Sequence, residues 1–251
     1  MANGCISTDR ILERLDEHLH RNDYPAAERH LVYWLGEAEN NRDLRTALLV
    51  RNELMGLYRK LGRQDEALGC ARAALSEIKT HGIAHQVGAA TTYLNAATVY
   101  KAFGMAADAL PLFEHARSVY ESELKPTDSR LGGLYNNMAL ALVDLGRFDE
   151  ARTLYEKAIS VMSESNDGML EVAITYLNLA SAAEAELGLE HAQEIITDYL
   201  KKAENLLEGH QKRDGYYAFV CEKCASVFDY YGHFYYAKEL TVRAGRIYEG
   251  T

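Results

Sequence analysis

Few residues in this sequence break helices, cross-link chains or form long apolar runs. It has three prolines and four cysteines among 251 residues. No glycine- and serine-rich linker separates one part from another, so nothing marks a domain boundary. Four cysteines are too few for a disulfide framework, which indicates a reducing compartment. No apolar stretch reaches the length of a signal peptide or a membrane span, and we therefore expect a cytoplasmic protein without a membrane segment.

Positive charge is also in short supply. The chain has 27 Lys and Arg residues against 37 Asp and Glu residues, a formal net charge of −10. An acidic chain is poorly suited to bind a phosphate backbone without specificity, so we expect no nucleic-acid partner. Partners of basic or mixed charge fit better, although a charge of this size also keeps a protein in solution.

What the chain does have is a turn residue that recurs along its whole length. The three central spacings are 42 residues, the first is 40 and the last is 44. A fixed period of this size is typical of stacked supersecondary units. The residues that mark the period are Asn22, Gly62, Gly104, Gly146, Gly188 and Gly232.

The pattern within each period predicts two helices. After the turn glycine, alanine recurs at +5 and +12 in four of the six units, and before it an aromatic or aliphatic residue recurs at −4. The offsets of 5 and 12 share one face of a helix, and small residues there let two helices approach closely. The recurring residues are Ala67, Ala109, Ala151 and Ala237, then Ala74, Ala116, Ala158 and Ala244, and before the glycine Tyr58, Tyr100, Leu142 and Phe228.

The runs GRQDEALGCARAAL (62–75) and GRFDEARTLYEKAI (146–159) resemble tetratricopeptide repeats, and the long period is similar to that of kinesin light chains. The resemblance implies an all-α fold, a right-handed α-α superhelix of about six helical hairpins. We expect a single solenoid domain over residues 1–251. Its units are expected at approximately 8–40, 44–80, 86–123, 128–164, 170–208 and 214–249.

An asparagine recurs on the face of the first helices that points away from the core. Asn95, Asn137 and Asn178 take this place in the third, fourth and fifth units. A carboxamide offers both a donor and an acceptor to an extended peptide backbone. In tetratricopeptide proteins that bind peptides, asparagines at the equivalent place clamp the ligand backbone, so the resemblance implies a clamp here. The alternative is that these amides bond neighbouring helices and stabilise the stack.

Other polar residues flank this asparagine ladder and would select the ligand. The second unit departs from the pattern, with Asn52 and Glu53 at the neighbouring places, and the sixth has Lys223. The candidate peptide-binding groove comprises Asn52, Glu53, Arg59, Lys60, Asn95, Thr98, Lys101, Asn137, Asp144, Asn178, Ser181 and Glu184.

No pattern in the sequence predicts catalysis, a cofactor or a metal. Cys221 and Cys224 form a single CxxC, which lacks the second ligand pair of a closed zinc site, and their offsets are core positions. His210 and His233 have no convincing spacing to complete such a site. Paired carboxylates such as Asp149 and Glu150 lie where a helix begins and complement its dipole. We therefore expect no enzyme.

The C-terminal unit is unusually rich in aromatic residues. Solenoids usually end in a capping helix with a polar outer face, whereas this chain ends directly after its last repeat helix. Aromatic residues are enriched in interface cores, so Tyr231, Tyr235 and Tyr236 are candidates for self-association, including a homodimer. The alternative is that Lys238, Glu239, Arg243 and Arg246 make the last helix polar enough by themselves.

Two classes of function remain open at this point. The first is an adaptor that binds an extended peptide or a partner segment in the concave groove, and a receptor for a signalling peptide is a variant of it. The second is a structural protein that assembles through its aromatic C-terminal unit. The fold alone does not decide between them, because function resides in sites placed on a fold.

Overall fold

The computed structural model describes residues 7–164 and 168–250, and within them the chain forms twelve α-helices and no strands. Residues 1–6, 165–167 and 251 lie outside the described residues. Cys5 and the N-terminal residues 1–4, for which we expect no signal peptide, are among them.

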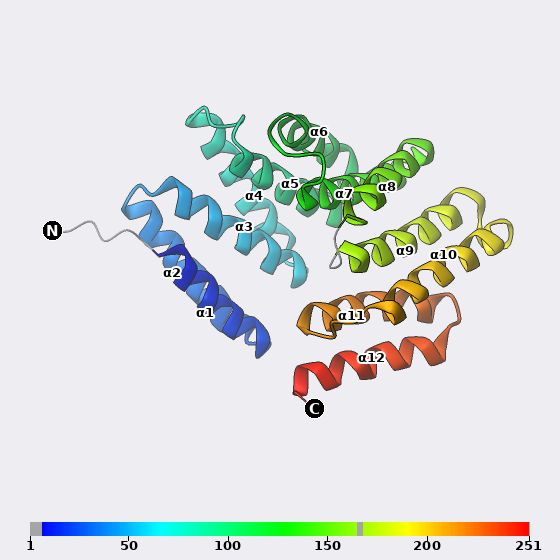
Figure 1. Cartoon of the computed structure of the whole chain (residues 1–251). Helices are drawn as coiled ribbons and strands as arrows, with labels where there is room; N and C mark the ends of the chain where they lie inside the picture. Colours follow the sequence, from blue (N-terminus) through cyan, green and yellow to red (C-terminus); the bar gives the residue numbers. More distant parts are fainter. Residues whose placement is uncertain (1–6, 165–167, 251) are drawn as a thin grey trace. The chain divides into compact units, whose positions relative to one another are not determined.

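The helices are paired in chain order into six antiparallel hairpins, which confirms the all-α fold of stacked hairpins (Figure 1). The first hairpins are α1 (Thr8–His20) with α2 (Tyr24–Asn40), α3 (Leu44–Lys60) with α4 (Gln64–Thr80), and α5 (Val87–Ala102) with α6 (Ala106–Glu123). They are followed by α7 (Ser129–Asp144) with α8 (Phe148–Met162), α9 (Gly168–Leu187) with α10 (Leu189–Gly209), and α11 (Gly215–Tyr230) with α12 (Phe234–Glu249).

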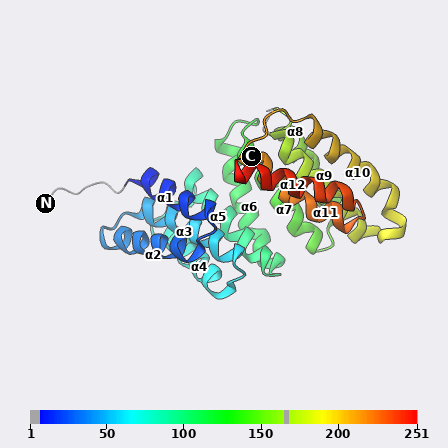
Figure 2. The ribbon, with the colours of Figure 1, turned by 90° about the horizontal axis from the view of Figure 1, so that it is seen from below.

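The hairpins belong to two units, residues 1–123 and residues 124–251, here called unit 1 and unit 2. Within each unit, neighbouring hairpins lie side by side in both views (Figures 1 and 2). First helices contact one another, as α3 does α5 and α7 does α9, and α9 also contacts α11. Second helices contact the first helix of the next hairpin, as α4 does α5 and α8 does α9.

The recurring turn residues are needed because the backbone turns through left-handed conformation at each hairpin. The φ angles are 69° at Gly62, 76° at Gly104 and 71° at Gly146, and Asn22 takes 53°. Glycine adopts this region without steric cost, and asparagine tolerates it better than most residues. The period in the sequence is therefore the period of the left-handed turns.

Alanine makes the close contact between the two helices of a hairpin. Four of the six second helices present alanine at both their fourth and eleventh residues, as Ala67 and Ala74 do in α4 and Ala151 and Ala158 do in α8. All four are 0 to 1% exposed. A larger side chain at these places would push the helices apart, since protein interiors have few voids to absorb it. This contact fixes each hairpin and leaves the other helix faces free to vary.

The fifth hairpin departs from the others in length. Its helices α9 and α10 have 20 and 21 residues, whereas the other ten described helices have 13 to 18. Gly188 is itself the N-cap of α10, while in the neighbouring hairpin one residue, Arg147, separates Gly146 from α8. The residue register before Gly188 is therefore shifted by one.

Replacement of Gly146 by alanine is expected to lower the free energy of unfolding by about 1 kcal/mol, because an L side chain at φ 71° is strained. Gly69→Ala is the matched control: Gly69 lies inside α4 and a Cβ there would meet nothing within 4 Å. That variant should raise the free energy of unfolding by about 0.5 kcal/mol. Urea denaturation measures both free energies of unfolding. Equal changes of the same sign in the two variants would contradict the conclusion that Gly146 is needed for its positive φ angle.

Candidate functional site

Three successive first helices of unit 2 enclose a shallow hollow that contains two asparagines of the ladder. Its volume is about 230 Å³. Counted back from the start of the second helix, Asn137, Asn178 and Lys223 occupy the same register position on α7, α9 and α11. Beside them the hollow is lined by Asn136, Leu140, Ile174, Leu177, Cys224 and Val227. Amide, ammonium and apolar groups thus meet in one place.

The asparagines of this hollow use only part of their hydrogen-bonding capacity within the protein. The side-chain amide of Asn178 donates to the Oδ1 atom of Asn136 at 3.1 Å, and the Thr175 hydroxyl reaches the same acceptor at 3.2 Å. The amide of Asn137 donates to the carbonyl of Gly133, one turn earlier, at 2.8 Å. Asn178 therefore ties α9 to α7, while Asn137 bonds only within its own helix.

Asn136 is a structural residue that the sequence pattern did not single out. The equivalent residue of the second hairpin is Asn52, whose amide donates to the Thr92 hydroxyl at 3.0 Å and so ties α3 to α5. The Oδ1 atom of Asn52 is buried and has no hydrogen-bond partner in the part of the chain that the structure describes. Asn52, Asn136 and Asn178 thus form hydrogen bonds between helices, as the structural interpretation of the asparagines expects. The sequence signal that could have pointed to Asn136 is the pair of adjacent asparagines at 136 and 137.

Unit 1 carries its own part of the predicted groove. Asn95 on α5 is half-buried and makes no side-chain hydrogen bond to the described residues. Thr98, one turn on, donates to the Leu94 carbonyl at 2.9 Å. Glu53 is half-buried, and burial, followed by the negative charge of Asp16, raises the pKa of its carboxyl.

The basic residues of unit 1 lie at the ends of its first helices. Arg59 and Lys60 form the last turn of α3, and Lys101 lies in the last turn of α5. The ammonium of Lys60 lies 5.0 Å from the centre of the Tyr24 ring. Arg59 and Lys60 are exposed and Lys101 is half-buried, so all three remain candidates for selecting a ligand.

The remaining groove residues of unit 2 are partly committed to internal contacts. The Glu184 carboxylate accepts hydrogen bonds from the hydroxyls of Tyr230 at 2.8 Å and Tyr231 at 2.7 Å, which ties α9 to the end of α11. Ser181 donates to the Leu177 carbonyl at 3.2 Å. Asp144 is exposed at the end of α7. The Glu184 carboxylate therefore holds α9 and the end of α11 together, and its selection of a ligand stays a prediction.

The three tyrosines predicted to mediate self-association differ in exposure. Tyr231 bonds Glu184, and Tyr236 donates to Glu208 at 2.8 Å while its ring packs edge-on against Phe228 at 4.8 Å between centroids. Both are half-buried, whereas Tyr235 is 95% exposed. Of the three, Tyr235 is the one whose ring is exposed to solvent.

The CxxC cysteines are both 0% exposed and line the core of unit 2. Burial raises the pKa of both thiols, that of Cys224 to about 12. A thiol in such surroundings is a poor nucleophile and a poor metal ligand, because both roles need the thiolate. Among the described residues, no three His, Cys, Asp or Glu side chains gather as metal ligands would.

Comparison with known proteins identifies the repeats. Residues 130–205 match the family model of the tetratricopeptide repeat. The chain is similar in fold to the TPR-like repeats of a kinesin light chain from Podosopora anserina, with a TM-score of 0.55 and 16% identity over 80% of this chain and 94% of that one. For BtubC (BKLC) from P. vanneervenii the TM-score is 0.57 and the identity 20%, over 92% and 91% of the two chains.

A third similar structure is that of NprR in complex with its cognate peptide NprX, with a TM-score of 0.61 and 17% identity over 96% of this chain and 68% of that one. No curated protein sequence matches the chain. The predicted resemblance to tetratricopeptide repeats is confirmed by the family model over residues 130–205, and the chain shares its fold with the TPR-like repeats of the kinesin light chain structure. None of the described helices combines the length and apolar character that a membrane span requires.

Replacement of Asn136 by alanine is expected to lower the free energy of unfolding by about 1 to 2 kcal/mol, because the Asn178 amide loses its acceptor in a partly buried place. Asn95→Ala is the matched control and should change stability by less than about 0.5 kcal/mol. Urea denaturation distinguishes the two. If Asn95→Ala were the more destabilising, the ladder would be structural throughout.

Alkylation of the native protein at pH 8 should spare Cys221 and Cys224, because both are buried and the pKa of Cys224 is raised to about 12. Cys70 is half-buried and should react first of these three. Peptide mass spectrometry after iodoacetamide treatment measures each site, with the guanidinium-unfolded protein as the fully reactive reference. Rapid labelling of Cys224 in the folded protein would contradict its core position.

Proposed function

We propose that this protein is a non-catalytic adaptor that binds an extended peptide segment of a partner protein along its first helices. In unit 2 the binding site is the hollow shared by α7, α9 and α11. The proposal is carried by one observation, the convergence of Asn137, Asn178 and Lys223 from three successive helices on that hollow. The proposed location is the cytoplasm, in line with the low cysteine content.

The chemistry of the hollow suits a peptide backbone. The side-chain amide N–H groups of Asn137 and Asn178 each donate one hydrogen bond within the protein. The side-chain carbonyl oxygen of each can accept a hydrogen bond from a backbone N–H of a ligand. Leu140, Ile174 and Val227 offer apolar contact for a side chain between those anchors. Pockets that combine apolar walls with a few oriented polar groups are the usual form of a binding site.

Proteins of similar fold support this class of ligand. NprR has been solved with its cognate peptide NprX, and a Rap protein has been solved with Competence and Sporulation Factor, at TM-scores of 0.61 and 0.54 and identities below 20%. The likeness concerns the fold alone. The proposal of a peptide ligand for this chain rests on the residues of its own hollow. A receptor for a free signalling peptide would use the same hollow.

Peptides selected from a random displayed library on the wild-type protein should bind Asn137→Ala more weakly by roughly fivefold or more, the worth of one hydrogen bond. Asn205→Ala, which removes an exposed asparagine of the outer helix α10, is the matched control and should leave the affinity unchanged. Isothermal titration calorimetry gives the affinities, and circular dichroism checks that all variants are equally helical.

Two results would contradict this function. One is the selection of peptides whose affinity is the same for Asn137→Ala, Asn205→Ala and wild type, which would exclude the hollow. The other is the failure of repeated selections to enrich any peptide.

A further inference from the structure

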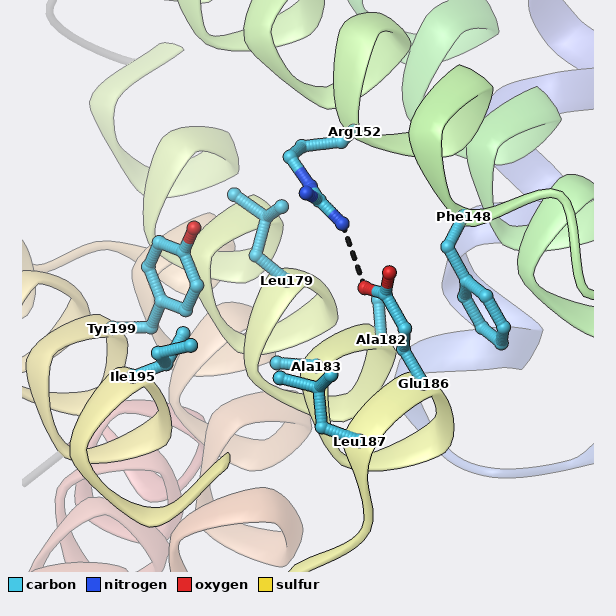
Figure 3. A pocket seen from close by; sticks show the side chains of 9 residues that line it. All are labelled: Phe148, Arg152, Leu179, Ala182, Ala183, Glu186, Leu187, Ile195 and Tyr199. Atoms are coloured by element: carbon cyan, nitrogen blue, oxygen red, sulfur yellow. Dashed lines mark hydrogen bonds and ion pairs between the residues drawn. The ribbon is translucent and has the colours of Figure 1, made fainter. Parts of the chain in front are cut away.

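A second hollow lies on unit 2 where α8, α9 and α10 meet (Figure 3). Its volume is about 230 Å³. Leu179, Leu187 and Ile195 contribute apolar walls, and Leu187 and Ile195 are 43% and 42% exposed. An ion pair of 2.6 Å between Arg152 and Glu186 borders the hollow, as the dashed line in Figure 3 marks. Here this region is called the outer hollow.

The outer hollow borders a position at which four other hairpins carry a large side chain. The sixth residue before the start of each second helix is Tyr58, Tyr100, Leu142 and Phe228 in four of the hairpins. In the fifth hairpin the same position is Ala183, and Ala182 precedes it. Both alanines line the outer hollow. The hollow is thus lined by alanine at the position where other hairpins carry tyrosine, leucine or phenylalanine.

The second hairpin shows how a tyrosine occupies this position. The Tyr58 side chain is 6% exposed, and its hydroxyl donates to Glu28 of the preceding helix α2 at 3.1 Å. The guanidinium of Arg63 lies 4.7 Å from the centre of its ring. For Ala183 of the fifth hairpin, the residue equivalent to Glu28 is Arg152 on the preceding helix α8, which pairs with Glu186 of α9. The outer hollow thus supplies both a carboxylate and a cation for a tyrosine that the chain lacks at residue 183.

The same unit carries a tyrosine with almost no contact to the protein. Tyr235, in the first turn of α12, is 95% exposed, and its neighbour Phe234 is 62% exposed. Exposed large aromatic residues of this kind mark interaction surfaces when charges surround them. Lys238 follows one turn later, and Arg213 borders the same surface.

The charges at the two places are complementary. Tyr235 is next to the cations Lys238 and Arg213 in a chain of net charge −10. The exposed residues around Ile195 of α10 include Glu190 and Glu194. Complementary charge orients an encounter and favours one pairing over others. A basic surface with a protruding tyrosine therefore matches an acidic surface with a cavity for one.

We propose that the outer hollow binds the Tyr235 side chain of a second copy of this chain. The ring enters the space above Ala183, and the hydroxyl approaches Arg152 and Glu186 as that of Tyr58 approaches Glu28. Donor and acceptor are different places on one unit, so the contact is heterologous and adds chains head to tail. A contact centred on one side chain is small, and the association is correspondingly weak.

Sedimentation equilibrium of the purified protein tests this proposal, over concentrations from about 5 µM to about 1 mM because small interfaces are weak. The wild-type mass should rise with concentration above the 28.1 kDa of one chain. Tyr235→Ala removes the donor and Ala183→Leu fills the acceptor, and each should weaken association at least tenfold. Higher salt should weaken wild-type association as well.

A mixture of the two variants gives the decisive result. Tyr235→Ala keeps an open hollow and Ala183→Leu keeps its tyrosine, so together they should form a closed pair of about 56 kDa, twice the 28.1 kDa of one chain. Neither variant should do so alone. A wild-type protein that stays monomeric over the whole range, or a mixture that does not associate, overturns the proposal.

Two controls separate this contact from a general effect on folding. Ala183→Leu introduces the residue that the fourth hairpin carries at the same position, and thermal unfolding should show an unchanged or higher Tm because the cavity is filled. If that variant unfolds, Ile195→Lys, which places a charge at an exposed wall of the hollow, replaces it in both measurements. Tyr33→Ala removes a 60% exposed tyrosine of unit 1 and should associate as the wild type does.

Discussion

The close contact between the two helices of each hairpin is the constraint on which the rest of this structure depends. Four of the six hairpins use alanine at two fixed positions of the second helix, and each hairpin has a residue of positive φ at its turn. With these positions fixed, a hairpin forms whatever its remaining faces carry, since small interfacial residues set the separation of helices more than specific large ones. The same scaffold can therefore present amides on one face and a cavity on another.

Periodicity was sufficient to predict the hairpins, their turns and the register of the asparagine ladder, because all three depend on local spacing. It was insufficient to predict which amides are already bonded. Asn178 reaches Asn136 from 42 residues away, and Asn52 reaches Thr92 from 40. Residues so far apart in the sequence come into contact only because the first helices stack. The pattern within a single helix therefore placed these asparagines on the correct face but did not reveal their hydrogen-bond partners on the next helix.

The aromatic C-terminal hairpin is a second case in which the sequence did not reveal the contacts of individual side chains. Composition indicates the number of tyrosines in this segment but not their directions. Tyr231 and Tyr236 are turned toward Glu184 and Glu208, carboxylates on two earlier helices, while Tyr235, which directly precedes Tyr236, faces solvent. The missing residue at Ala183 was visible in principle. Counting back four residues from Gly188 gives Glu184, because the fifth turn is one residue shorter, and the shift hides the alanine.

The outer face of α12 favours side-chain insertion over continued stacking as a means of self-association. Residues of second helices that face the next hairpin are buried and mostly apolar, as Ala71 and Ile78 are in α4 and Tyr155 and Met162 are in α8. The corresponding residues of α12 are Thr241 and Tyr248, both exposed, and the Tyr248 hydroxyl donates to Glu222 at 3.3 Å. A further hairpin docked there would take the Thr241 hydroxyl and the Tyr248–Glu222 hydrogen bond, with its charged carboxylate, out of water, which costs free energy. Because Tyr235 lies one turn before Lys238, at the start of the helix, it can enter a cavity on another copy while this polar end face stays in water.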